Sequence, residues 1–252
     1  MNMKNIAAAL IFFTRLPFYK LKLFNVPAEH FKQAINYWPV IGWLTGGITA
    51  LMLWVCSFIF PPSIAVLLAI TTRLLLTGAL HEDGLSDFFD GLGGGTTKTR
   101  VLEIMKDSRI GVYGVISLIL YFLLLHQCLT SLGSQVAVIA ILSADPLAKL
   151  IASNINKVLP YARTEETSKA KVVYGKMSIA TFIFAYVLGL TPFIFLIPYE
   201  IWWIIIFPIL TFVLIYGILK KRIQGYTGDC CGALFLLCEL SIYLGILLTL
   251  NI

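Results

Sequence analysis

Long apolar runs dominate this sequence, and they decide which solvent the chain can fold in. Of the 252 residues, 59% are hydrophobic and only 13% are charged. A soluble globular domain carries roughly a quarter charged residues, and a disordered chain carries far less apolar surface. The composition therefore excludes both classes and indicates a protein whose surroundings are a lipid bilayer.

Seven segments are apolar over the length of a membrane span, which needs about 20 residues. They cover residues 37–60, 62–80, 112–131, 136–153, 178–197, 201–219 and 233–251. We predict an all-α, polytopic membrane helical bundle that forms a single domain over residues 1–252. The stretch 6–18 is short and contains Arg15 and Pro17, so it favours a half-inserted or interfacial N-terminal helix over a signal peptide.

The basic residues gather on one side of the predicted spans. Seventeen of the 19 Lys and Arg residues lie in the N-terminal segment or in the connections 81–111, 154–177 and 220–232. The other three connections carry none. By the positive-inside rule the basic segments face the cytoplasm, so the N-terminus is inside and the C-terminus, after seven crossings, is outside. Topology thus explains the positive charge, and no nucleic acid partner is predicted.

An acidic segment follows the second predicted span. It reads His81-Glu82-Asp83-Gly84-Leu85-Ser86-Asp87-Phe88-Phe89-Asp90-Gly91. Carboxylates this close repel one another unless a cation neutralises them, and a continuing helix would place Asp83, Asp87 and Asp90 on one face. Such oxygen ligands suit Mg²⁺. We predict a magnesium site formed by Glu82, Asp83, Asp87 and Asp90, with a solvated acidic helix end as the alternative.

A second polar segment, Met105-Lys106-Asp107-Ser108-Arg109-Ile110-Gly111, precedes the third span. Lys106 and Arg109 are suited to hold phosphate oxygens, Arg by a bidentate fork and Lys as a point charge. Asp107 is a candidate metal ligand or general base. The alternative is that both cations only anchor the span at the headgroups. Acidic metal ligands followed by phosphate-binding cations indicate phosphoryl transfer.

Four ionisable residues interrupt the apolar spans, where such groups are usually functional or paired. They are Arg73, Asp145, Lys149 and Glu239. Asp145 and Lys149 are four residues apart, a spacing at which they can pair with each other. Arg73 and Arg15 are predicted to reach a diphosphate held at the metal, and Asp229, at the start of the last span, to join the same site. The complete set of predicted substrate-binding residues is Arg15, Arg73, His81, Lys106, Ser108, Arg109 and Asp229.

Several of these blocks resemble the adenosylcobinamide-GDP ribazoletransferase family, also called cobalamin-5'-phosphate synthases. The similarity runs along most of the chain. It includes Phe13-Thr14-Arg15-Leu16-Pro17, Tyr37-Trp38-Pro39-Val40-Ile41-Gly42, the segments 81–91 and 105–111, and the late Gly228-Asp229, Gly232 and Glu239. Lys149 departs from the family pattern, in which Arg is expected at this position.

The resemblance implies a multi-pass inner-membrane enzyme late in cobalamin (vitamin B12) biosynthesis. It would join adenosylcobinamide-GDP to α-ribazole or its 5'-phosphate and release GMP, with Mg²⁺ required and Asp107 or Asp90 taking the hydroxyl proton. We expect the active site on the cytoplasmic side, in 81–111 and 220–232. Membrane lipid surrounds such a protein, and a homo-oligomer or a complex with other cobalamin-assembly enzymes stays open.

Two other functions compete with this assignment. A lipid-headgroup phosphotransferase of the CDP-alcohol type also uses Asp-rich membrane helices. A secondary transporter has less support, because it would place its polar residues near the membrane midplane, often in repeated halves.

Overall fold

The computed structural model describes residues 2–20, 25–163, 175 and 177–250, and no β-strand occurs among them. The α-helices are α1 (Met3–Phe13), α2 (Trp38–Cys56), α3 (Pro62–Thr77), α4 (Leu80–Gly94), α5 (Lys98–Lys106), α6 (Val112–Ser131), α7 (Gly133–Ser153), α8 (Ile155–Val158), α9 (Ile179–Leu196), α10 (Ile206–Arg222) and α11 (Gly228–Leu250). The 3₁₀ segments among the described residues are η1 (Phe18–Lys20), η3 (Ala28–Tyr37) and η4 (Tyr199–Ile205). The all-α prediction is confirmed. Four of the basic residues counted above, Lys22, Lys169, Lys171 and Lys176, lie outside the described residues.

Within the described ranges, six continuous helical segments are long and apolar enough to cross a membrane, and the bent pair α3 and α4 would be a seventh. This agrees with the predicted number of spans, and the short helix α1 precedes them as expected. Large apolar side chains such as Leu123, Phe195 and Leu214 are exposed on the outside of the bundle. Apolar surface of this extent suits contact with lipid rather than water, so the chain is a multi-pass membrane protein.

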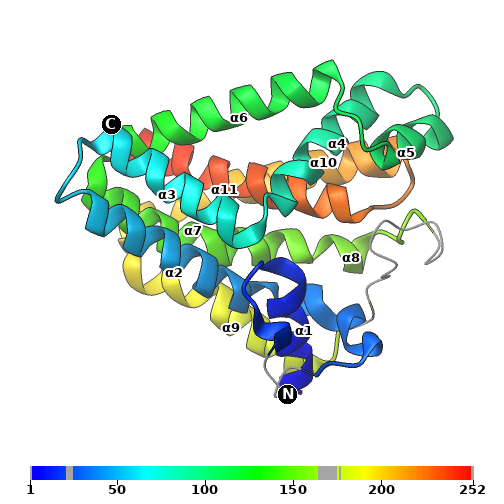
Figure 1. Ribbon diagram of the computed structural model, residues 1–252, viewed down its shortest axis with the longest axis horizontal. Helices are drawn as coiled ribbons and strands as arrows, with labels where there is room; N and C mark the ends of the chain where they lie inside the picture. The colour runs from blue at the N-terminus through cyan, green and yellow to red at the C-terminus, as the bar shows by residue number, and fades with distance from the viewer. Residues whose placement is uncertain (1, 21–24, 164–174, 176, 251–252) are drawn as a thin grey trace.

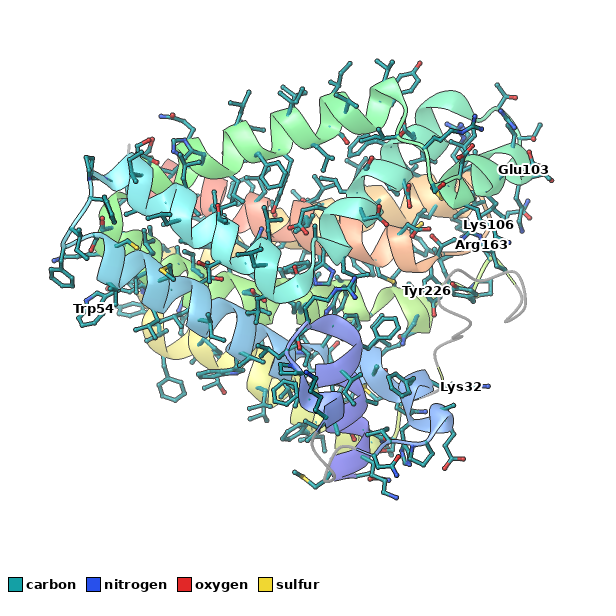
Figure 2. The ribbon with its side chains drawn as sticks, in the orientation of Figure 1. Lys32, Trp54, Glu103, Lys106, Arg163 and Tyr226 are labelled. Atoms are coloured by element: carbon teal, nitrogen blue, oxygen red, sulfur yellow. The ribbon has the colours of Figure 1, made fainter. Side chains whose placement is uncertain are left out.

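The two ends of the bundle differ in chemistry. In Figure 1 the turn at 57–61 and the C-terminus lie at one end, whereas α5 and the connections at 107–111, 159–163 and 223–227 lie at the other. Figure 2 shows Lys106 and Arg163 at this second end and Trp54 at the first. The basic connections that the sequence separates by dozens of residues therefore share one end of the molecule.

Small residues let the central helices approach closely. A Cβ on Gly42 of α2 would lie 2.5 Å from the Cα of Pro146 in α7. Helix α11 contacts α4, α6, α7 and α10. At its first turns a Cβ on Gly84 would lie 3.0 Å from the carbonyl oxygen of Asp229, and one on Gly232 would lie 3.1 Å from that of His81. The starts of α4 and α11 thus pack backbone against backbone, as small residues allow between membrane helices.

The acidic segment is helical, as the shared face of its carboxylates requires, but it forms a helix separate from the second span. Helix α3 ends at Thr77, and α4 begins at Leu80 after a bend of 89°. The cause is a pair of left-handed residues, Gly78 with φ of 65° and Ala79 with φ of 54°. Glycine adopts this conformation without a steric penalty and is a common helix terminator, whereas alanine does so at some cost. The bend moves the carboxylates of α4 to the basic end of the bundle.

Candidate active site

A cavity of about 620 Å³ opens at the bend between α3 and α4. Among its lining residues are eight of the twelve predicted site residues, namely Arg15, Glu82, Asp83, Asp87, Lys106, Asp107, Ser108 and Arg109. We call it the charged cavity. The first turns of α4 supply three of its carboxylates, and the last residue of α5 and the segment that follows it supply Lys106 and Arg109. The structure therefore brings together the two polar segments that the sequence singled out.

Arg15 reaches the charged cavity because the segment after α1 is bound to the end of α3. The backbone N–H of Arg15 donates to the carbonyl of Leu76 at 2.7 Å. Its side chain lies directly over Gly78, so closely that a Cβ there would collide with it. The glycine therefore has two roles, because it permits the left-handed turn and it leaves room for the guanidinium group.

Asp107 and Arg109 form an exposed ion pair on one wall of the cavity. Arg109 Nη2 lies 2.7 Å from Asp107 Oδ2, and the backbone N–H of Arg109 donates to Asp107 Oδ1 at 3.0 Å. The hydrogen bonds from Arg109 lower the pKa of Asp107 to about 2. A carboxylate with so low a pKa is a weak base near neutral pH, so the pair is better suited to hold charge than to accept a proton.

Asp90 lies on the same helix as Asp83 and Asp87, but its carboxylate contacts the start of α6. The backbone N–H of Gly111 donates to Oδ2 at 2.7 Å, and that of Gly114 donates to Oδ1 at 2.9 Å. An acidic side chain at a helix N-terminus satisfies free N–H groups and complements the helix dipole. Asp90 thus anchors α6 to α4, and its predicted roles as base and metal ligand stay predictions.

Arg73 is buried among the helices and is not among the residues that line the charged cavity. Its Nη1 lies 2.5 Å from Oε2 of Glu239, and its Nη2 donates to the hydroxyl of Tyr121 at 2.6 Å. The same Nη2 lies 3.7 Å from Oε1 of Glu82. Arg73 therefore approaches the cavity through Glu82, and its predicted contact with substrate stays a prediction.

The buried charges of α7, Asp145 and Lys149, pair with each other. Lys149 forms an ion pair with Asp145 one turn earlier on α7, as their spacing indicated. The hydroxyl of Thr45 lies within hydrogen-bond distance of both side chains, and the ammonium group lies 3.9 Å from the ring centroid of Phe235. The predicted pairing is confirmed.

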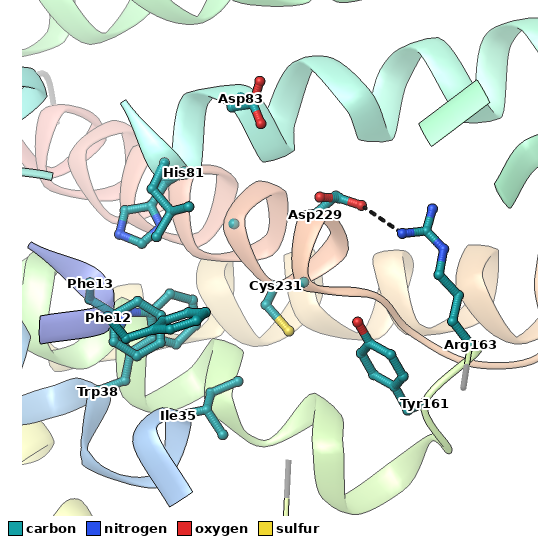
Figure 3. A pocket seen from close by; sticks show the side chains of 13 residues that line it. Phe12, Phe13, Ile35, Trp38, His81, Asp83, Tyr161, Arg163, Asp229 and Cys231 are labelled. Atoms are coloured by element: carbon teal, nitrogen blue, oxygen red, sulfur yellow. Dashed lines mark ion pairs between the residues drawn. The ribbon is translucent and has the colours of Figure 1, made fainter. Parts of the chain in front are cut away.

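His81 and Asp229 line a second, smaller pocket of about 120 Å³ on the other side of the first turn of α4 (Figure 3). We call it the aromatic pocket. Its lining residues are Phe12, Phe13, Ile35, Trp38, Leu80, His81, Asp83, Tyr161, Arg163, Gly228, Asp229, Cys231 and Gly232. Leu80 and Asp83 line both spaces, so the aromatic pocket and the charged cavity border each other at the start of α4.

Sequence reasoning did not assign Arg163 and Tyr161 to the site. Arg163 counted only toward topology, yet its Nη1 lies 3.7 Å from Oδ2 of Asp229, and both side chains are largely buried. A backbone bridge brings this segment there, since the N–H of Ala162 donates to the carbonyl of Tyr226 at 2.8 Å. No local pattern indicates a contact between segments about 65 residues apart in the chain.

The donor chemistry of the charged cavity suits a hard cation. Both carboxylate oxygens of Glu82 are buried and accept no hydrogen bond from the part of the chain that the structure describes, and Asp83 and Asp87 line the same space. Oxygen ligands of this kind are the ones that Mg²⁺ prefers. Among the described residues, however, no three His, Cys, Asp or Glu side chains are close enough together to hold a metal ion. The ligand types fit magnesium, and the side chains are not assembled around a common centre.

Comparison with known proteins shows the family of the chain. Residues 5–247 match the family described as cobalamin-5-phosphate synthase. An adenosylcobinamide-GDP ribazoletransferase from Shewanella frigidimarina is 37% identical over 251 residues, which cover 95% of this chain and 92% of that protein. Another so named, from Shewanella oneidensis, is 35% identical over 238 residues, with 93% and 90% covered. No solved structure matches the chain. The chain therefore belongs to the cobalamin-5-phosphate synthase family.

Proposed function

We propose that this protein joins adenosylcobinamide-GDP to α-ribazole, or to its 5'-phosphate, in a late step of cobalamin biosynthesis. The observation that carries the proposal is the charged cavity, in which carboxylates of α4 face Arg15, Lys106 and Arg109. Such a cavity suits a diphosphate. The names of the similar proteins identify adenosylcobinamide-GDP as the compound that carries the diphosphate and ribazole as the nucleoside that reacts with it.

The reaction is a phosphoryl transfer. A ribose hydroxyl of the acceptor forms a bond to the cobinamide-side phosphorus, the bond from that phosphorus to the bridging oxygen breaks, and GMP leaves. The hydroxyl proton passes to a carboxylate of the cavity. In this chemistry the protein contributes mainly positioning and charge neutralisation. Arg15, Lys106 and Arg109 are the side chains available to bind phosphate oxygens, with the Ser108 hydroxyl as a hydrogen-bond donor.

We propose Mg²⁺ as the metal, with Glu82, Asp83 and Asp87 as its ligands. When bound, the ion would neutralise the diphosphate and the developing charge. The two buried oxygens of Glu82 support this proposal, because they accept no hydrogen bond from the described residues and such acceptors are costly to leave unsatisfied. Oε1 of Glu82 also lies 3.7 Å from Nη2 of Arg73, which compensates part of its charge from the interior side.

The basic end of the bundle supports a cytoplasmic location for the site, in a bacterial inner membrane. Lysine and arginine in short connections favour the cytoplasmic face, and the charged cavity opens among these connections. Nucleotide substrates are made in the cytoplasm, so this orientation gives them direct access to the cavity.

A direct assay tests the function. Purified protein, adenosylcobinamide-GDP, α-ribazole and Mg²⁺ should yield GMP. Asp83→Ala and Asp87→Ala should each lower the rate by at least about a hundredfold, because each removes charge stabilisation at the reacting diphosphate. Glu103→Ala is the matched control, since Glu103 is an exposed acidic residue at the same end, paired with Arg100 outside the cavity.

The outcomes separate the competing functions. No GMP release by well-folded wild-type protein refutes the proposal. Consumption of CDP-diacylglycerol in its place would identify a lipid-headgroup phosphotransferase. Wild-type GMP release with full activity in both Asp variants would leave the reaction intact and remove the metal assignment.

A further inference from the structure

The aromatic pocket has two chemically different halves. Figure 3 shows Phe12, Phe13 and Trp38 together on one side with His81 above them, and Asp229 and Arg163 on the other. The rings of Phe13 and Trp38 are stacked with centroids 5.2 Å apart, and that of His81 lies 5.5 Å from that of Trp38. The pocket therefore offers flat apolar walls at one end and charged hydrogen-bonding groups at the other.

Two ring nitrogens at the aromatic end have no hydrogen-bond partner among the described residues. Nε1 of Trp38 and Nε2 of His81 are both buried without a hydrogen bond, and both residues line the pocket. Trp38 is 1% exposed and His81 is 3% exposed, so water in the bulk solvent does not satisfy them. Buried polar atoms are nearly always hydrogen-bonded, and exceptions need an explanation such as a ligand.

The size of the pocket selects the class of ligand. A single water, which is one non-hydrogen atom, needs roughly 10–15 Å³ of cavity volume. The 120 Å³ of the aromatic pocket therefore accommodate about ten non-hydrogen atoms. A fused bicyclic aromatic base has about that many. Nε1 of Trp38 can only donate and therefore requires an acceptor, which a free ring nitrogen supplies, while the hydrocarbon edge of the base would meet Phe12, Phe13 and Ile35.

The position of the pocket fits an acceptor nucleoside. Because Leu80 and Asp83 line both spaces, a sugar attached to a base in the aromatic pocket would lie beside Asp83 at the border of the charged cavity. A ribose hydroxyl at this border faces the space where a diphosphate is expected. Guanine fits less well at the aromatic end, because its amide and amino groups need several acceptors, and among the described side chains there His81 Nε2 is the one acceptor without a hydrogen bond.

We infer that the aromatic pocket is the binding site for the benzimidazole base of the acceptor nucleoside, with Trp38 Nε1 donating to the free ring nitrogen. The ribose then lies between the Arg163–Asp229 pair and Asp83, with its reacting hydroxyl toward the charged cavity. This inference rests on the proposed function, which supplies α-ribazole as the acceptor. The two can fail separately, because binding of the nucleoside is measured without turnover.

Two variants test the pocket by different means. Gly228 lines it, and a Cβ built there meets no atom within 4 Å, so Gly228→Leu adds bulk to the pocket without an initial clash. Trp38→Phe keeps an aromatic wall and removes the donor. Gly47→Leu is the matched control, since a Cβ at Gly47 in α2 also meets nothing within 4 Å and lies outside the pocket.

The measurements are the Kd of α-ribazole by calorimetry in nanodiscs, the KM of each substrate, and the melting temperature of each variant. Gly228→Leu should raise the Kd and KM of α-ribazole at least about tenfold, and Trp38→Phe by about threefold to tenfold. The KM of adenosylcobinamide-GDP should stay within about twofold, and Gly47→Leu should match the wild type.

Several results would overturn the inference. One is a loss of GMP and adenosylcobinamide-GDP binding in Gly228→Leu with α-ribazole unaffected, which would assign the pocket to guanine. Another is unchanged α-ribazole binding in both folded variants. If the wild type binds α-ribazole in this pocket but releases no GMP, the subsite stands and the proposed reaction fails.

Discussion

Asp90 offers the sharpest test of how the site is built, because its carboxylate has a structural contact and a predicted chemical role. It is buried on α4 and accepts two backbone N–H groups from the start of α6. Asp90→Asn replaces one carboxylate oxygen by an amino group, so that an N–H donor of the side chain faces a backbone N–H donor of α6. The variant should therefore loosen the attachment of α6 to α4 as well as lower activity.

The magnitude follows from the contacts that are lost. A hydrogen bond to a charged group contributes about 1.5–3 kcal/mol, and an anion at a helix N-terminus adds about 0.3–1 kcal/mol. Losing one such bond and the charge should lower the free energy of unfolding by about 2–4 kcal/mol. For a chain of this size that corresponds to a fall of roughly 4–16 °C in melting temperature.

The five cysteines, all buried and free, supply the assay. A thiol-reactive dye reacts with them only as the helices separate, so its fluorescence reports unfolding in detergent. Gly114→Ala should reproduce the loss of stability, because a Cβ there would collide with the Asp90 carboxylate. Asp83→Asn, at an exposed position of the same helix, should lose activity and melt with the wild type. An Asp90→Asn variant that melts within about 2 °C of the wild type would refute the anchoring role.

Two further predictions concern the ion pairs Arg73–Glu239 and Asp107–Arg109. Glu239→Gln removes the partner of a buried guanidinium, so we expect a loss of about 3–5 kcal/mol in thermal unfolding, and the double variant Arg73→Met with Glu239→Leu should recover most of it. A double variant no more stable than Glu239→Gln would contradict this. Arg109 holds the pKa of Asp107 at about 2, below its ordinary value, so Asp107 stays ionised above that range and loses its charge only as the pH falls through about 2. The kcat/KM profile between about pH 5 and 8 should therefore contain no acid limb from Asp107, and a limb that disappears in Asp107→Asn would show that the pair opens during turnover.

Features that depend on a single segment could be predicted from the sequence. The spans were found because apolar length is a local property that the thickness of the bilayer fixes. For example, the prediction 112–131 matches α6 at both ends. The acidic and basic segments were recognised for the same reason, since each places several charges within a dozen residues. Their meeting in one cavity was predicted from the shared cytoplasmic side, and the structure shows it.

Features that depend on long-range contacts could not be predicted. Nothing near Arg163 indicates that its partner is Asp229, because the backbone bridge between Tyr161 and Tyr226 makes that contact. The anchoring of α6 by Asp90 likewise depends on two glycine N–H groups more than 20 residues away. The bend after α3 had a local signal in Gly78, a common residue just past a helix end, but a helix end alone does not determine the direction in which the next helix runs.

The bend at Gly78 and Ala79 also determines how the two halves of the reaction can meet. It places the first turn of α4 between the charged cavity and the aromatic pocket, with Asp83 on the border of both. An acceptor that enters from the aromatic pocket attacks from this border, and in-line displacement requires the leaving group on the opposite side of the phosphorus. Residues 106–110 line the charged cavity but not the aromatic pocket, so Lys106 and Arg109 lie on the wall available to the departing GMP. The exposure of these two cations at the rim then has a function, because a product phosphate bound there remains close to water and can be released.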